Sequence, residues 1–350
     1  MEENKTHADI DESAKKKIAP VSPAIASALL LAAIFAIYAF SYRGSAVALS
    51  LAPALPVLAI FGAGAFAYTV LKSTPLAVGS AVLSLCVMTG LSLLCKISVG
   101  EAVALAAWPF VALLGGAVMG FCTRKNKDMK TTVILSALLP CAFAVAVVML
   151  CSYIVTGSPF ETLRSSFSQA REETVILLEE SMAQMKELGY ESALDAKALI
   201  NETFNILPGT LIAIAVVLSY LMQKTMFFVA RLFGSPSDIP EKAKALEITV
   251  VAAIVYAVSL ALSLFLPAGM VQVASHNIAI CFVPALALVG IKTQFAQRRG
   301  GVVKIGCLPI IIFAFLFYMN PALATKVLAL FGAFEIVGQA RNKSKKFRPE

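Results

Sequence analysis

Few residues in this chain are of the types that do chemistry, and none is spaced as a known catalytic motif requires. The sequence contains only two histidines, His7 and His276, which are too few to build a metal site. It contains no H-E-x-x-H, no G-x-S-x-G and no phosphate-binding loop. We therefore expect no catalytic residue, no metal and no cofactor, and predict that the chain is not an enzyme.

The cysteines also point away from chemistry. None of the seven belongs to a C-x-x-C pair, and all lie in or at the ends of apolar runs: Cys86, Cys95, Cys122, Cys141, Cys151, Cys281 and Cys307. This spacing is typical neither of a metal site nor of a disulfide framework. We interpret them as small apolar residues inside helices that face lipid.

Four polar residues stand out because they interrupt apolar runs: His276, Asn277, Asn320 and Lys326. Ionisable and amide side chains are expensive in hydrocarbon, so inside a membrane they often mark a binding site or an ion pathway. We take these four as a candidate solute pocket. The alternative is that they are separate residues near the membrane surface that never meet.

The elements that must position these residues are long apolar segments. The chain has 350 residues, of which 59% are hydrophobic and 14% charged, whereas soluble domains carry about 25% charged residues. About 20 apolar residues cross a bilayer as a helix. Ten segments qualify or nearly qualify: Val21–Tyr42, Ala48–Leu71, Pro75–Cys95, Ala102–Cys122, Thr131–Val155, Ile206–Phe233, Ile248–Leu266, Val271–Ile291, Ile305–Met319 and Pro321–Val337.

The predicted fold class is therefore all-α: a polytopic transmembrane helical bundle of about 8–10 spans with an external amphipathic helical insertion. We divide the chain into a cytoplasmic polar tail, a five-span bundle, the insertion, a second membrane bundle and a basic cytoplasmic tail, at residues 1–20, 21–155, 156–205, 206–338 and 339–350. The last two apolar segments, 305–337, form either a hairpin or one helix broken at Asn320-Pro321.

Charge predicts the orientation. The net charge is +8, but the segment from Pro159 to Phe204 carries nine acids and four bases, a local charge of −5. The basic residues flank alternate spans, as in the loop Arg124–Lys130, and cytoplasmic loops carry such an excess. Both termini then lie in the cytoplasm and the acidic insertion lies outside. This distribution fits lipid as the partner and does not favour nucleic acid.

The insertion reads as an amphipathic helix. Ser158-Pro159-Phe160-Glu161 has the pattern of a helix start. Apolar residues then recur at three- and four-residue steps, among them Phe160, Leu163, Phe167, Met182 and Met185, and Gly189 can end the helix. We expect a second short helix over Ser192–Thr203. The helix is either a lid or partner-binding arm, or a helix that simply lies at the membrane interface.

Small residues recur every four positions on two spans. Ala28, Ala32 and Ala36 line one face of the first span, and Ala112, Gly116 and Gly120 line one face of the fourth. Small residues let helices approach closely in lipid. Such a face packs either inside its own protein or against a separate membrane subunit, so the first of the two is a candidate docking face.

Three stretches carry a family resemblance. The acidic insertion runs into Asn205-Ile-Leu-Pro208 and a span that ends in Lys224–Phe233. The linker Gly234–Pro240 (GSPSDIP) precedes the next span, and Leu330-Phe-Gly-Ala-Phe-Glu335 leads into Arg341–Lys346. With these features the chain resembles the YybS-like family of uncharacterised bacterial membrane proteins, a domain of unknown function. The resemblance implies a multi-pass protein of the bacterial cytoplasmic membrane.

That family is distantly similar to the substrate-binding components of energy-coupling-factor transporters. The similarity implies a helical bundle that binds a small solute and acts with a coupling subunit and ATPases, docking through an Ala-x-x-x-Ala face that Ala28, Ala32 and Ala36 match. We therefore hypothesise a transport-related membrane protein that binds a solute within its bundle. The alternative hypothesis is a membrane scaffold or regulator of envelope or cell-division processes.

Overall fold

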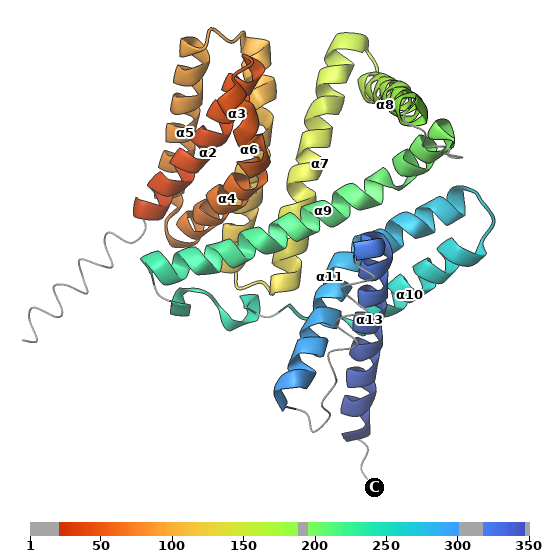
Figure 1. Ribbon diagram of the computed structural model, residues 1–350. Coiled ribbons are helices and arrows are strands. Elements are labelled where there is room, and N and C mark those ends of the chain that lie inside the picture. Colours follow the sequence, from red (N-terminus) through yellow and green to blue (C-terminus); the bar gives the residue numbers. More distant parts are fainter. Residues whose placement is uncertain (1–20, 188–194, 235, 245, 301–317, 347–350) are drawn as a thin grey trace, which may run out of the picture. The chain divides into compact units, whose positions relative to one another are not determined.

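The computed structural model describes residues 21–187, 195–234, 236–244, 246–300 and 318–346. Over these residues the chain is all-α, with helices joined by short loops and no strand (Figure 1). The predicted fold class is confirmed. The expected span Ile305–Met319 lies almost wholly outside the described residues, and Gly189, the N-terminal tail and residues 347–350 lie wholly outside them.

The first half of the chain forms six helices and one 3₁₀ turn (Figure 1). They are α2 (Val21–Tyr42), α3 (Ala46–Leu51), η1 (Ala52–Ala54), α4 (Leu55–Lys72), α5 (Thr74–Leu94), α6 (Val99–Arg124) and α7 (Met129–Thr156). The helix expected over Ala48–Leu71 is thus divided. Pro53 and Pro56 explain the division, because proline lacks the backbone N–H that an uninterrupted helix uses.

The second half begins with the polar helix α8 (Glu161–Glu187) and the 38-residue helix α9 (Ala196–Phe233). Two 3₁₀ turns follow, η2 (Pro236–Asp238) and η3 (Glu241–Ala243). The chain continues with α10 (Val250–Phe265), α11 (Met270–Gly300) and α13 (Pro321–Lys346).

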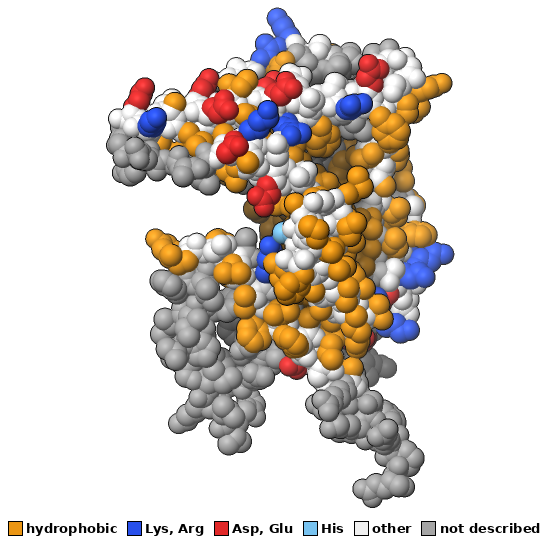
Figure 2. Space-filling model, turned by 90° about the vertical axis from the view of Figure 1, so that its right-hand side faces the viewer, with side chains coloured by type: hydrophobic (Ala, Val, Ile, Leu, Met, Phe, Trp, Pro, Cys, Tyr) orange, Lys and Arg blue, Asp and Glu red, His pale blue; other side chains and the backbone are white. Residues whose placement is uncertain are grey.

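Eight of the described helical segments are long and apolar enough to cross a membrane. Large apolar side chains remain exposed along them, for example Leu94 at 81% and Phe334 at 67% of their full exposure. Figure 2 shows hydrophobic side chains over much of one face, with charged side chains gathered on the polar helix. Soluble proteins rarely expose apolar surface on this scale. The chain is an integral, multi-pass membrane protein whose apolar helix faces contact lipid.

The chain folds as two compact units. Unit 1 comprises residues 1–144 and 218–247, and unit 2 comprises residues 145–217 and 248–350. Two helices, α7 and α9, therefore contribute their two ends to different units.

Close helix contacts at small residues hold unit 1 together. Gly116 of α6 lies against the backbone of Ala63 of α4, and Gly120 lies against Ala67 one turn further on. On the neighbouring pair, Ser27 of α2 and Ser80 of α5 are hydrogen-bonded at 2.7 Å between their Oγ atoms. Interfaces of this kind are typical of helices in lipid, where dispersion contacts and hydrogen bonds replace the hydrophobic effect.

The linker after α9 packs against α4 within unit 1. Asp238 accepts a hydrogen bond from Tyr68 Oη at 3.2 Å and forms an ion pair with Lys72 at 2.5 Å. The buried amide of Gln223 donates to the carbonyl of Ala243 at 3.1 Å. Gly234 lies so close to Tyr68 Oη that a side chain would not fit. The linker GSPSDIP thus ties the end of α9 to α4.

In unit 2, too, glycines bring the backbones of two helices into close contact. Gly290 of α11 lies against the carbonyl of Leu328 of α13, and Gly332 of α13 lies against Leu286 of α11. An apolar cluster around Tyr256, Leu286 and Ala329 joins α10 to these two helices.

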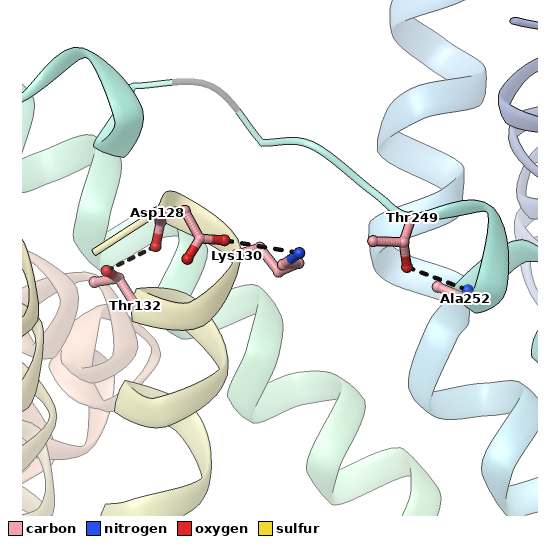
Figure 3. Close-up of polar contacts among 5 residues, drawn as sticks. All are labelled: Asp128, Lys130, Thr132, Thr249 and Ala252. Carbon is pink, nitrogen blue, oxygen red and sulfur yellow. Dashed lines mark hydrogen bonds and ion pairs between the residues drawn. The ribbon is translucent and has the colours of Figure 1, made fainter. Parts of the chain in front are cut away.

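Polar contacts lie at the starts of two helices, α7 and α10, and Figure 3 shows them. At α7 the carbonyl of Asp128 accepts from Thr132 Oγ1 at 3.0 Å, and its carboxylate lies 3.8 Å from Lys130 Nζ. A hydrogen bond with Thr131 holds the pKa of Asp128 below its ordinary value. At α10 Thr249 Oγ1 accepts from the N–H of Ala252 at 3.4 Å. The Thr249 bond is a helix cap, because it satisfies an N–H group that the first helical turn leaves unpaired.

Two expectations for the insertion are wrong. Helix α8 begins at Glu161, three residues after Ser158, which instead accepts from Ser152 and Thr156 through its carbonyl. The separate short helix over Ser192–Thr203 does not exist. Asp195 caps a helix through the N–H groups of Lys197 and Ala198, and that helix runs on through Pro208 as α9.

The Gly116 contact gives a first prediction. A Cβ at Gly116 would meet the carbonyl oxygen of Ala63 at 2.5 Å, so Gly116→Ala should force α4 and α6 apart and cost about 1–3 kcal/mol. The measurement is the thermal unfolding midpoint of the purified protein in mild detergent. The matched control is Gly79→Ala, where a Cβ meets open space. An equal midpoint for the two variants would show that the contact does not stabilise unit 1.

Candidate functional site

A small cavity in unit 2 contains two of the four candidate pocket residues. Helix α10 contributes Tyr256, Leu260 and Ser263, α11 contributes His276, Ala279, Ile280 and Val283, and α13 contributes Lys326. The structure therefore brings His276 and Lys326 together. The cavity volume is about 10 Å³, which is room for one water-sized atom.

Hydrogen bonds from side chains to backbone carbonyls join the three helices around this cavity. Tyr256 Oη donates to the carbonyl of Lys326 at 3.0 Å and so ties α10 to α13. Gln272 Nε2 donates to the carbonyl of Ser263 at 3.2 Å and ties α11 to the end of α10. Tyr256 is fully buried. These two bonds therefore link α10 to α13 and α11 to α10 beside the cavity.

Asn277 points to a different helix. Its Oδ1 accepts from the N–H of Gly209 at 2.6 Å, and its Nδ2 donates to the carbonyls of Asn205 at 2.8 Å and of Val273 at 2.9 Å. Gly209 N–H and Asn205 C=O are the two groups that an uninterrupted α-helix would pair with each other. The amide of Asn277 therefore bridges α9 at the position where Pro208 weakens its hydrogen-bond ladder.

Gly209 is required for this bridge. A Cβ at Gly209 would lie 2.7 Å from both the carbonyl oxygen and Oδ1 of Asn277. Cys281, one turn along α11, places its Sγ 3.8 Å from the carbonyl of Gly209. Membrane proteins tolerate proline inside a helix where a neighbouring side chain satisfies the freed backbone groups. Sequence reasoning missed this role of Asn277, because the pairing spans 68 residues.

Asn320 has a local role at the start of α13. Its Oδ1 accepts from the N–H of Leu323 at 2.9 Å, and its carbonyl accepts from Ala324 at 3.0 Å. Asn320 does not line the cavity, and neither does Asn277. Of the four candidate residues, two line one cavity and two use their amides to satisfy helix backbone.

The other candidate faces are placed as follows. Ala28 and Ala32 are buried within unit 1, and Ala36 is partly exposed. On α8 and the turn before it, Phe160 and Phe167 are at least half exposed, Met185 is exposed and Met182 is partly covered, while the side chain of Leu163 lies outside the described residues. Among the described residues, no three His, Cys, Asp or Glu side chains lie together as a metal site.

Comparison with known proteins found no match for this chain. No family model, no curated protein and no solved structure matches the chain. The fold and the site thus define a class, a polytopic helical membrane protein with a small, mostly apolar cavity in its second unit. The resemblance to the YybS-like family stays a prediction.

The Asn277 bridge gives a second prediction. Asn277→Leu removes the hydrogen bonds that join α11 to Asn205 and Gly209 of α9, so it should destabilise the protein by about 1–3 kcal/mol. The measurement is the thermal midpoint in detergent. The control is Thr210→Val, which removes only a bond from Thr210 to Ile206 of its own helix. If the two variants unfold at the same temperature, the bridge does not support α9.

Proposed function

We propose that the chain is a transport-related membrane protein that binds a small solute within its helix bundle and acts with partner subunits. The observation that carries this proposal is the cavity of unit 2, which Lys326 and His276 line together with apolar side chains of α10 and α11. Charged and titratable side chains are costly among transmembrane helices and are retained there mainly for function.

The sparse distribution of such residues supports a role that depends on partners. Coupled pumps and transporters need several ionisable groups in their spans to relay ions or protons. The sequence carries no nucleotide-binding loop. Energy for movement of a solute would then come from separate ATPases through a coupling subunit. We further propose that the chain belongs to the YybS-like family and lies in a bacterial cytoplasmic membrane with both termini inside.

The test is a mild-detergent purification of the tagged chain, followed by mass spectrometry of the proteins and small molecules that it retains. We expect a coupling subunit with ATPases, or one solute in stoichiometric amount. An unrelated tagged multi-pass protein, expressed at the same level, is the control. Recovery of neither class of molecule above that control would contradict the proposal.

One observation favours the alternative, a scaffold or regulator. Around α8, Phe160, Phe167 and Met185 are among the large apolar side chains exposed on a helix rich in polar and charged residues. Large exposed apolar side chains among polar ones are typical of surfaces that bind another protein or the membrane interface. The polar helix would then hold a partner of the cell envelope or the division machinery.

The scaffold role predicts a selective loss of partners. Replacing Phe160, Phe167 and Met185 together by serine should reduce recovery of envelope or division proteins, while the amount of inserted protein stays the same. The matched control replaces three exposed polar residues of the same helix by alanine: Ser166, Ser168 and Gln184. A set of retained proteins that is unchanged in the serine variant argues against the scaffold role.

A further inference from the structure

The first half of α8 carries two aromatic and two basic side chains on one face. Phe160 and Arg164 lie seven and three residues before Phe167, and Arg171 lies four residues after it. Residues at these spacings share one face of a helix. All four side chains are exposed, Phe160 at 62% and Phe167 at 50% of full exposure. The acids of this half lie on its other faces: Glu161, Glu172 and Glu173.

The turn before α8 folds back onto the end of the membrane-crossing helix α7. Gly157 has a φ of 74°, a left-handed conformation that glycine adopts without strain. The carbonyl of Ser158 accepts hydrogen bonds from Ser152 Oγ at 2.7 Å and from Thr156 Oγ1 at 3.1 Å. Ser152 belongs to the apolar span of α7, which runs to Ile154. The start of α8 therefore lies level with the last turn of that span, at the surface of the bilayer.

A second contact holds α8 near the bilayer ten residues further on. The guanidinium of Arg171 donates a hydrogen bond to Asn201 Oδ1 of α9. Asn201 lies five residues before Ile206, where the apolar part of α9 begins, which is about 8 Å along the helix. Both ends of the segment 161–171 are therefore close to the membrane surface, and this part of α8 runs along that surface.

Lipid is the occupant that fits the exposed face of this segment. Tyr153 and Ile154, in the last turn of the α7 span, are exposed, so the surface next to the start of α8 already contacts lipid. Aromatic side chains are enriched where a membrane meets water. Arginine binds phosphate oxygens through paired N–H groups. The face around Phe167 therefore combines apolar rings for the acyl chains with basic groups for the lipid headgroups.

We propose that residues 161–171 of α8 lie on the bilayer surface, with the rings of Phe160 and Phe167 among phospholipid acyl chains and Arg164 at the level of the phosphates. A helix in this position buries its apolar face about 5–10 Å below the headgroups. The inference goes beyond the proposed solute-binding function and does not depend on it.

The experiment places one tryptophan on either side of α8. Trp108 is the only tryptophan of the chain, so Trp108→Phe gives a background without this fluorophore. Phe167→Trp then probes the proposed lipid-facing side. The matched control is Ile176→Trp, because position 176 is nine residues along the helix, on the opposite side, and its native side chain is similarly exposed at 55%. Each full-length variant is reconstituted as a single copy in phosphatidylcholine nanodiscs, where both membrane surfaces are accessible.

The two probes should respond in opposite ways to quenchers in lipid and in water. A nitroxide on the acyl chain near the headgroup should quench Phe167→Trp about twofold more than Ile176→Trp, because the inserted ring lies at that depth. Acrylamide in the water should quench Ile176→Trp more strongly. Adding Phe160→Glu to Phe167→Trp should raise the quenching by acrylamide, because a charge is costly in hydrocarbon. Phe160→Trp is the second probe if Phe167→Trp fails to fold.

The outcomes distinguish lipid from other occupants of this face. Equal quenching of Phe167→Trp and Ile176→Trp by the nitroxide, with equal access of acrylamide, overturns the proposal and leaves the face free for a protein partner. Protection of Phe167→Trp from acrylamide only in discs with two copies also overturns it and assigns the face to a second copy of the chain. Neither result affects the solute-binding function.

Discussion

The structure depends on one constraint: inside hydrocarbon, each backbone N–H and C=O must find a partner within the protein. Helices meet this constraint segment by segment, which is why the described chain is helical almost throughout. The same constraint explains the exception at Pro208. There the helix lacks one of its own donors, and Asn277 of α11 supplies an amide that bonds the two backbone groups next to the break. A side chain far away in sequence thus becomes part of the backbone hydrogen-bonding of α9.

A second consequence of lipid is that apolar contact alone does not select which helices pair, because lipid tails offer a lipid-facing helix the same contact. In both units the pairing is instead set by glycines that bring backbones together. Gly116 and Gly120 do this for α4 and α6, and Gly290 and Gly332 do it for α11 and α13. Polar links such as Ser27 with Ser80, and Tyr256 with the backbone of Lys326, then fix the rotation of one helix against another.

The cavity follows from this arrangement. Because α10, α11 and α13 are held close by small residues and by hydrogen bonds from side chains to backbone carbonyls, His276 and Lys326 line the same mostly apolar cavity. Two adjacent residues of α11 have different roles. His276 faces the cavity, while Asn277 supports α9. Helix α11 is therefore the element that connects the candidate site with the interrupted part of α9, and a ligand that moved α11 would act on both.

The sequence by itself determined the fold class and most helix positions, because a run of apolar residues of membrane-crossing length has no other stable form in lipid. It predicted α2 to the residue and placed α5, α6 and α7 within a few residues of their ends. It did not predict the division of α3 from α4 or the continuity of α9 through Pro208. Whether a proline ends a helix depends on what its neighbours offer the freed backbone groups, and here the answer lies in Asn277. Only the tertiary structure decided which polar residues meet: spacing in the sequence cannot show that Lys326 joins His276 in one cavity while Asn277 and Asn320 turn to the helix backbone.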